Sequence, residues 1–271
     1  MIRDVPPLTL LDSSSMTEMI KVEDLNRIRT ITLNRPEKKN ALTREMYDTL
    51  SLAIRTASGA GDVDVICITG SGDAFTSGND LQDFVALPPP ISRKVGPGGL
   101  FAALNGSEKP VIAAVNGMAV GIGTTMLLHC DLVYATSSAR FKLPFAGIGL
   151  VPEGGSTQLL PELIGHRRAS EALLFGDWID ASAAKSWGIL NDVFDEASFV
   201  AAVRERAERL AKLPRRLVRL TLALLKKPSS NLLERMDEEL GLLSQQIGKP
   251  EANEAFTAMR EKRAANFGGF S

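Results

Sequence analysis

Residues 111–130, VIAAVNGMAVGIGTTMLLHC, decide the predicted fold class. Val111–Asn116 is a short apolar run typical of a buried strand, and residues 121–129 have the spacing of an apolar helix. Gly121 and Gly123 stand where the strand gives way to the helix. Because glycine permits a tight turn, this stretch predicts a strand that leads through a glycine turn into a helix.

The same order of strand and helix recurs on both sides of that stretch. Residues 63–69 and 132–135 form further short apolar runs, and helical patterns cover residues 79–84 and 98–107. Strands that alternate with helices favour β-α-β crossovers and a mainly parallel sheet. The predicted fold class is therefore α/β.

The N-terminal part differs from this centre. Residues 1–17 contain proline and serine and are expected to form a flexible tail. Residues 19–23 and 28–34 carry the β-branched residues of a hairpin. Thr43 can cap a helix that runs to about residue 58.

The C-terminal part is predicted to be helical throughout. Helical patterns follow residue 195, with helices expected at residues 215–227, 229–246 and 251–265. The sequence therefore divides into the tail (1–17), an α/β core (18–195) and a C-terminal helical region (196–271).

Composition limits the possible partners and locations. The net charge of the 271 residues is −1, so nucleic acid and anionic membranes are not expected as partners. Apolar runs stay below the roughly 18 residues of a membrane span. Cys67 and Cys130, the two cysteines, lie in apolar runs and are expected to be buried thiols. With no signal peptide in view, a cytoplasmic location is the expectation.

Common catalytic motifs are absent from the sequence. It contains no G-x-S-x-G elbow, no Walker loop and no H-E-x-x-H, and its only histidines are His129 and His166, so no metal site is expected. His129 lies in the apolar helix as a core or surface side chain, and His166 is expected in a turn. Gly121 and Gly123 resemble a dinucleotide fingerprint, but Arg140 and Phe141 stand where its acidic residue belongs.

Two glycine turns can instead hold an oxygen atom. One is formed by residues 75–81 and the other by residues 121–124, and each is expected to follow its own strand and open a helix. The free N–H groups of a first helical turn can bind an oxygen that gains negative charge. Asp80, in the first turn, has the simpler alternative of complementing the helix dipole.

Glu153 is the candidate acid or base. It stands between Pro152 and the pair Gly154-Gly155, on constrained backbone before another expected helix. One interpretation is a first-turn glutamate favoured by the dipole of that helix. The other is a general base held in a pocket.

Several ordered motifs make residues 18–271 resemble the crotonase superfamily, the enoyl-CoA hydratase/isomerase family. The segments that carry the resemblance are Leu33–Pro36 with Asn40–Leu42, Ile68–Gly70 with Ser77–Leu81, Ala114–Gly117 with Gly121–Gly123, and Cys130–Ala135. The resemblance implies a spiral of β-β-α units followed by a helical trimerisation region. It also implies an acyl-CoA thioester substrate, no separate cofactor, and an oxyanion hole made by the amides of Asn79 and Ile122.

Carboxylate positions indicate the reaction. Enoyl-CoA hydratases use two glutamates, and the matching positions here hold Thr125 and Phe145, so two-glutamate addition of water is not available. Glu153 falls where peroxisomal-type Δ3,Δ2-enoyl-CoA isomerases carry one catalytic glutamate. The resemblance thus implies an isomerase that converts 3-enoyl-CoA to 2-trans-enoyl-CoA. Alternatives are an enoyl-CoA hydratase, an epoxyacyl-CoA isomerase, a thioester hydrolase, or a non-catalytic module that binds acyl-CoA or protein.

The resemblance also implies residues that bind the substrate and an assembly. The substrate-binding candidates are Lys39, Ala41, Ser77, Gly78, Asp80, Leu81, Gly121, Thr125, Phe145 and Lys262. A homotrimer or a dimer of trimers is expected, in which Lys262 on the last helix reaches CoA in a neighbouring subunit. The plainer alternatives are a solvated turn around Lys39 and an ordinary basic helix end around Lys262.

Overall fold

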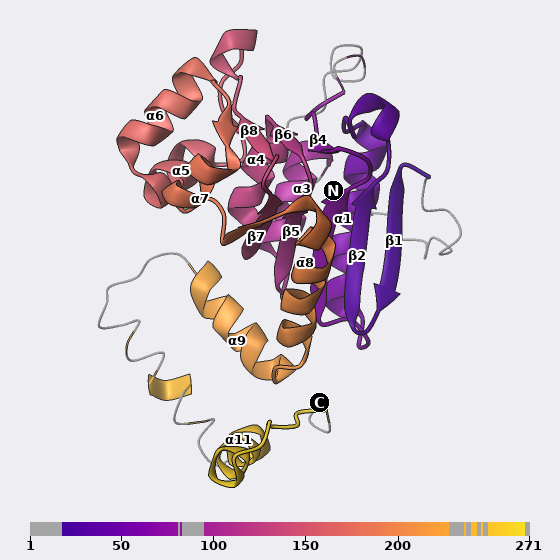
Figure 1. Ribbon diagram of the computed structural model, residues 1–271, viewed down its shortest axis with the longest axis vertical. Helices are drawn as coiled ribbons and strands as arrows, with labels where there is room; N and C mark the ends of the chain where they lie inside the picture. The colour runs from indigo at the N-terminus through magenta and orange to yellow at the C-terminus, as the bar shows by residue number, and fades with distance from the viewer. Residues whose placement is uncertain are drawn as a thin grey trace, which may run out of the picture.

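The computed structural model describes residues 18–80, 82, 95–227, 236, 240–242, 245 and 249–268. The predicted tail at residues 1–17 and most of the helix predicted at 229–246 lie outside these residues. Two β-sheets and the helices around them form the body of the molecule, and helix α11 lies at its C-terminal end (Figure 1).

The larger sheet has six strands in the order β1-β2-β3-β5-β7-β10. Their bounds are Ile20–Leu25, Ile28–Leu33, Val65–Gly70, Val111–Val115, Leu132–Thr136 and Asp192–Phe194. β1 and β2 form an antiparallel hairpin, whereas β2, β3, β5, β7 and β10 run parallel to one another. The predicted hairpin and the predicted parallel sheet are therefore both confirmed.

A second sheet of four short strands positions the candidate site. Its strands are β4 (Ala74–Thr76), β6 (Met118–Val120), β8 (Arg140–Lys142) and β9 (Ile179–Asp180), in that order. β4, β6 and β8 each follow one long strand of the first sheet, so the chain winds through successive β-β units. The glycine turns do follow the predicted strands, but the short strands β4 and β6, which the apolar pattern did not predict, lie in between.

The corners between the two sheets pack backbone against backbone. A Cβ atom on Gly117, between β5 and β6, would lie 2.1 Å from the carbonyl oxygen of Asp73. A Cβ atom on Gly70, the last residue of β3, would lie 2.2 Å from the carbonyl oxygen of Ala74 in β4. Side chains are excluded at these contacts, so glycine allows β3 to turn into β4 and β5 to turn into β6.

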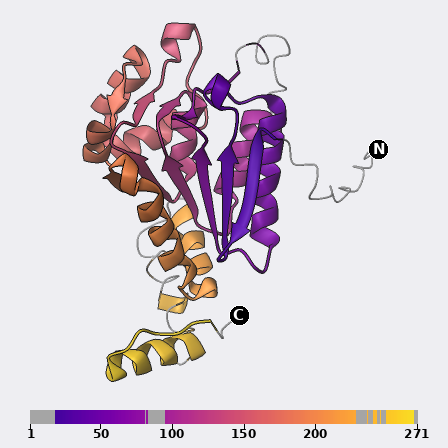
Figure 2. The same cartoon turned by 45° about the vertical axis from the view of Figure 1, so that its right-hand side comes forward.

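One face of the larger sheet is covered by α1 (Arg44–Gly59), which packs against α3 (Gly96–Asn105). Thr43 caps α1 as predicted, because its hydroxyl accepts a hydrogen bond from Met46 N at 3.3 Å. Met46, Leu50 and Ile54 share the buried face of α1. In Figure 2 the sheet stands between the purple helix α1 and the orange helix α8.

The opposite face is covered by α8 (Glu196–Ala211). Phe199, Val203 and Ala207 of α8 pack on a second apolar cluster that includes Val65 and Ile112 of the sheet. α8 therefore belongs to the packing of the sheet, although it follows residue 195.

The remaining helices surround the smaller sheet and the C-terminal end. They are η2 (Pro36–Lys38), α4 (Ile122–Thr125), η3 (Met126–His129), η4 (Ala146–Ile148), α5 (Ser156–Ile164), α6 (His166–Phe175), α7 (Ala181–Trp187), α9 (Arg215–Lys226) and α11 (Pro250–Glu261). The helices expected at 121–129, 215–227 and 251–265 are confirmed in type. His166 begins α6 and does not lie in a turn, and Cys130 is half-buried, whereas Cys67 is buried.

Candidate active site

The parallel pairing of β4 with β6 brings the two glycine turns together. Thr76 at the end of β4 is in register with Ala119 of β6. A Cβ atom on Gly78 would lie 2.8 Å from Val120 O, and one on Gly123 would lie 2.6 Å from Thr76 Cγ2. Because only glycine fits these contacts, the two turns can lie side by side.

Each turn presents a backbone N–H group that has no partner among the described residues. Around Asn79, Leu42 N donates to Gly78 O and Asp80 N donates to Leu42 O, so the Asn79 amide faces the other way. Ile122 is the first residue of α4, where backbone amides have no helical acceptor. Gly121 has φ +57°, which directs the chain into this helix. Two amides on adjacent turns can bind one oxyanion.

Glu153 lies on the loop between η4 and α5 and is held by α4. The hydroxyl of Thr125 donates a hydrogen bond to Glu153 Oε1. Burial raises the pKa of Glu153 to about 7, and the Thr125 hydrogen bond partly offsets that effect. A carboxyl group with this pKa can both accept and return a proton near neutral pH.

Side chains from η3 and α3 contact the loop that carries Glu153. His129 Nε2 on η3 lies 2.7 Å from Gly154 O, and the His129 ring lies 4.9 Å from the Phe101 ring on α3. A Cβ atom on Gly154 would lie 2.5 Å from Phe101 Cζ. The backbone directly after Glu153 therefore touches both side chains, and His129 has a defined partner in this loop.

Tyr47 is a residue of the site that the sequence analysis missed. It lies on α1, is buried, and donates a hydrogen bond from its hydroxyl to Asn79 Oδ1 at 2.5 Å. Burial and the charge of Glu153 raise the pKa of Tyr47 well above its ordinary value. The sequence does contain an indication of this contact: a tyrosine on the apolar face of a predicted helix is expected to be buried, and a buried hydroxyl needs a hydrogen-bond partner.

The segment from Lys39 to Leu42 lies alongside the first glycine turn. Ser77 N donates to Lys39 O at 2.9 Å, and Ala41 is buried. The side chain of Lys39 is half exposed, and its ammonium group pairs with Asp73 at 2.8 Å. A phosphate group at this position would compete with that carboxylate.

The remaining predicted residues fall into three groups. Asp80 pairs with Arg35 at 2.5 Å and accepts a hydrogen bond from Gln82 N, so its carboxylate has local partners. Phe145 is buried next to η4, and Leu81 lies outside the described residues. Lys262 is the exposed cap of α11, which lies at the opposite end of the molecule from β4 and β6 (Figure 1).

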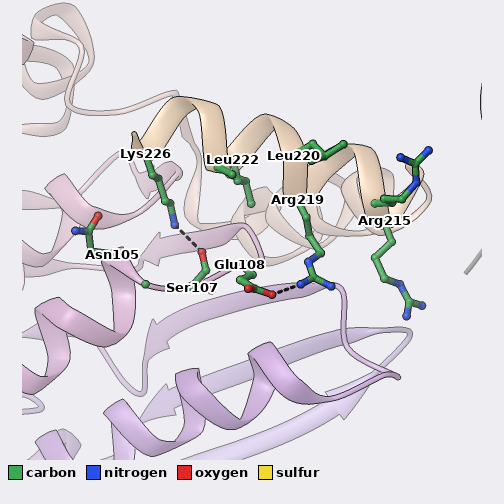
Figure 3. Close-up of a pocket in the computed structure, with 11 residues that line it drawn as sticks. Asn105, Ser107, Glu108, Arg215, Arg219, Leu220, Leu222 and Lys226 are labelled. Carbon is green, nitrogen blue, oxygen red and sulfur yellow. Dashed lines mark hydrogen bonds and ion pairs between the residues drawn. The ribbon is translucent and has the colours of Figure 1, made fainter. Parts of the chain in front are cut away.

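A cavity of about 610 Å³ lies elsewhere, between α9 and the segment that precedes β5 (Figure 3). Its cationic side chains already have partners: Arg219 pairs with Glu108, and Lys226 donates to Ser107 O at 3.1 Å. Asn79, Ile122 and Glu153 do not line this cavity. It is therefore separate from the candidate active site.

The described part of the chain contains neither a cluster of metal ligands nor a membrane-spanning helix. No group of three or more His, Cys, Asp or Glu side chains there could hold a metal ion. No helix in the same residues has the length and apolar character needed to span a membrane.

The two largely parallel sheets and the helices around them form a crotonase-like α/β fold. The chain belongs to the enoyl-CoA hydratase/isomerase family, whose sequence model matches residues 23–269. The solved structure of an enoyl-CoA hydratase/isomerase from Pseudoalteromonas atlantica is 38% identical to this chain, with a TM-score of 0.75. The match covers 92% of this chain and 99% of that one.

The similar proteins are named for more than one reaction. Enoyl-CoA delta isomerase 2 of Rattus norvegicus is 37% identical over 217 residues, which are 78% of this chain and 55% of that protein. The chain thus spans about half the length of that relative. Crotonyl-CoA hydratase of Syntrophomonas wolfei is 33% identical over 254 residues, which are 92% of this chain and 98% of that protein.

Proposed function

We propose that the protein is an acyl-CoA isomerase that moves the double bond of a 3-enoyl-CoA to give 2-trans-enoyl-CoA. The observation that carries the proposal is the position of Glu153. Its carboxyl group, with a pKa of about 7, hydrogen-bonds to the same short helix whose first amide is that of Ile122. The acid and the oxyanion donor are thereby fixed relative to each other.

The proposed reaction needs one acid and two amides. The thioester oxygen accepts hydrogen bonds from Asn79 N–H and Ile122 N–H. Glu153 removes a proton from C2, and the electrons of that C–H bond form a dienolate whose oxygen the two amides stabilise. The protonated Glu153 then donates the proton to C4, so the double bond moves from C3–C4 to C2–C3. CoA is part of the substrate, and the shuttle uses no further cofactor.

Thr125 and Phe145 argue against hydration in this proposal. Addition of water to a 2-enoyl-CoA in hydratases draws on two glutamates, and these positions supply a hydroxyl and an apolar ring. Thr125 is fully buried and already engaged with Glu153. We therefore favour proton transfer over water addition, although one relative bears the name of a crotonyl-CoA hydratase.

We also propose a trimer or a dimer of trimers, in which the C-terminal helix of one subunit contributes to the site of another. Phe256 and Met259 on α11 are 56% and 75% exposed, which leaves an apolar surface available to a partner. Helix α11, which Lys262 caps, lies at the far end of the molecule from β4 and β6 (Figure 1), so in this proposal Lys262 serves the site of a neighbouring subunit.

The Glu153→Gln variant tests the proposed function. Gln keeps the shape of the side chain but cannot take up a proton, so we expect kcat with 3-enoyl-CoA to fall by at least about 10³ while acyl-CoA affinity changes little. Glu171→Gln, an exposed glutamate on α6, serves as the control and should retain full activity. Near-normal turnover by Glu153→Gln would remove Glu153 from the proposed role.

A further inference from the structure

One four-residue helix, α4, contributes to both halves of the candidate site. Ile122 begins the helix and Thr125 ends it, three residues later. Residues at this spacing lie on the same side of a helix. Thr125 N donates to Gly121 O at 3.0 Å, which fixes the backbone, while its fully buried hydroxyl donates to Glu153 Oε1.

We propose that Thr125 is a positioning residue: its hydroxyl holds Oε1 of Glu153 and leaves Oε2 as the oxygen that carries the proton between C2 and C4. This inference rests on the proposed isomerase function. Thr125 occupies the position of a hydratase glutamate, but in this role its hydroxyl determines which oxygen of the Glu153 carboxyl group transfers the proton.

The hydroxyl also controls the titration of Glu153. Burial favours the neutral acid, and the hydrogen bond from Thr125 favours the carboxylate. The other titratable groups around Glu153 are Tyr47 on α1 and His129 on η3. Both are neutral near pH 7, because burial raises the pKa of Tyr47 and lowers the pKa of His129. Thr125 therefore acts on Glu153 without competition from a charged neighbour among these groups.

The adjacent residue, Thr124, provides a matched control. It is also buried on α4, but its hydroxyl donates to the backbone oxygens of Ala119 at 2.7 Å and Lys142 at 3.2 Å. Loss of the Thr124 hydroxyl should thus disturb packing and backbone bonding in the same helix without removing a donor from Glu153.

The test compares Thr125→Val, Thr125→Ser and Thr124→Val. The pKa of Glu153 is measured by isotope-edited infrared spectroscopy of its carboxyl group, and kcat/KM with 3-enoyl-CoA is measured against pH. Because hydrogen bonds to charged groups contribute about 1.5–3 kcal/mol, Thr125→Val should raise the pKa of Glu153 by roughly one to two pH units. The acidic limb of the profile of kcat/KM against pH should shift to higher pH by the same amount, which gives at least about a tenfold loss of kcat/KM at pH 6.

Thr125→Ser should keep the wild-type pKa of Glu153 and the wild-type position of the acidic limb. Thr124→Val should also leave the acidic limb at its wild-type pH. An unchanged Glu153 pKa in Thr125→Val would overturn the inference, as would an equal shift in Thr124→Val. Thr125→Ala gives a second hydroxyl-free variant if Thr125→Val does not fold. The proposed function can fail separately from this inference. If the wild type does not isomerise 3-enoyl-CoA, but Thr125→Val still raises the pKa of Glu153 in the infrared measurement, the proposed function is rejected and the contact between Thr125 and Glu153 is supported.

Discussion

Comparing Gly154→Ala with Gly155→Ala should separate an effect on kcat from an effect on stability. Gly154 and Gly155 follow Glu153, and both adopt the left-handed backbone conformation, with φ +64° and +68°. A Cβ atom on Gly154 would lie 2.5 Å from Phe101 Cζ, whereas one on Gly155 would meet nothing closer than Leu159 Cδ1 at 3.9 Å. The variants Gly154→Ala and Gly155→Ala thus share the backbone strain but differ in the contact.

The expected magnitudes follow from these two distances. Left-handed backbone costs an alanine roughly 1 kcal/mol, so Gly155→Ala should lose about that much stability. An ordinary carbon–carbon contact is about 3.5 Å, so in Gly154→Ala the loop and the Phe101 ring must move apart by about 1 Å. Overpacking of this kind adds about 1–3 kcal/mol. Because a catalytic group misplaced by about 1 Å can lose about 10²-fold in rate, kcat of Gly154→Ala should fall by that order.

Urea denaturation and steady-state kinetics with 3-enoyl-CoA measure the two effects. Gly155→Ala should keep kcat within about threefold of the wild type. Phe101→Leu placed in the Gly154→Ala background removes the ring atom that clashes, and should recover part of the lost kcat. Equal losses of kcat in Gly154→Ala and Gly155→Ala, or full activity in Gly154→Ala, would refute the view that the Phe101 contact positions Glu153.

Three further changes test other contacts of the site. Tyr47→Phe should lower kcat by about tenfold. Asn79→Ala removes the same hydrogen bond, so the loss of kcat in the double variant should be smaller than the two single losses combined. Additive losses in this double-mutant cycle would contradict the role of the hydrogen bond. His129→Gln keeps a donor for Gly154 O and should retain more activity than His129→Leu, and equal kcat in the two variants would show that the hydrogen bond is not needed. Since folding raises the pKa of Glu153 from 4.5 to about 7, the wild type loses stability as pH rises through 7, by up to about 3 kcal/mol. Glu153→Gln lacks this loss and should gain stability relative to the wild type between pH 5 and pH 8 in chemical denaturation, a trend that Glu171→Gln should not show.

The longer elements of the fold could be predicted because their side chains repeat a pattern. The hairpin, the long strands and α1 each extend over enough residues to show apolar spacing or a cap. β4, β6 and β8 have three residues each, which is too short for a period of two to be recognised. They exist because tertiary contacts at the sheet corners, such as that between Gly117 and Asp73, place their backbones together.

The candidate site could be predicted where its residues lie in local motifs. The glycine turns and Glu153 stand out in the sequence, and the structure places both turns on adjacent short strands. The hydrogen bonds from Tyr47 to Asn79 and between His129 and Gly154 join residues 32 and 25 positions apart. Such contacts depend on how whole elements pack, so one sequence alone contains no pattern from which to derive them.

In the proposed mechanism, the single carboxyl group of Glu153 supports isomerisation and not hydration. The most direct measurement compares two initial rates of the wild-type protein at the same concentration: conversion of a 3-enoyl-CoA to its conjugated 2-trans isomer, and addition of water to crotonyl-CoA. We predict rapid isomerisation and, because Thr125 and Phe145 replace the hydratase glutamates, only marginal hydration. A hydration rate equal to or greater than the isomerisation rate would contradict the account.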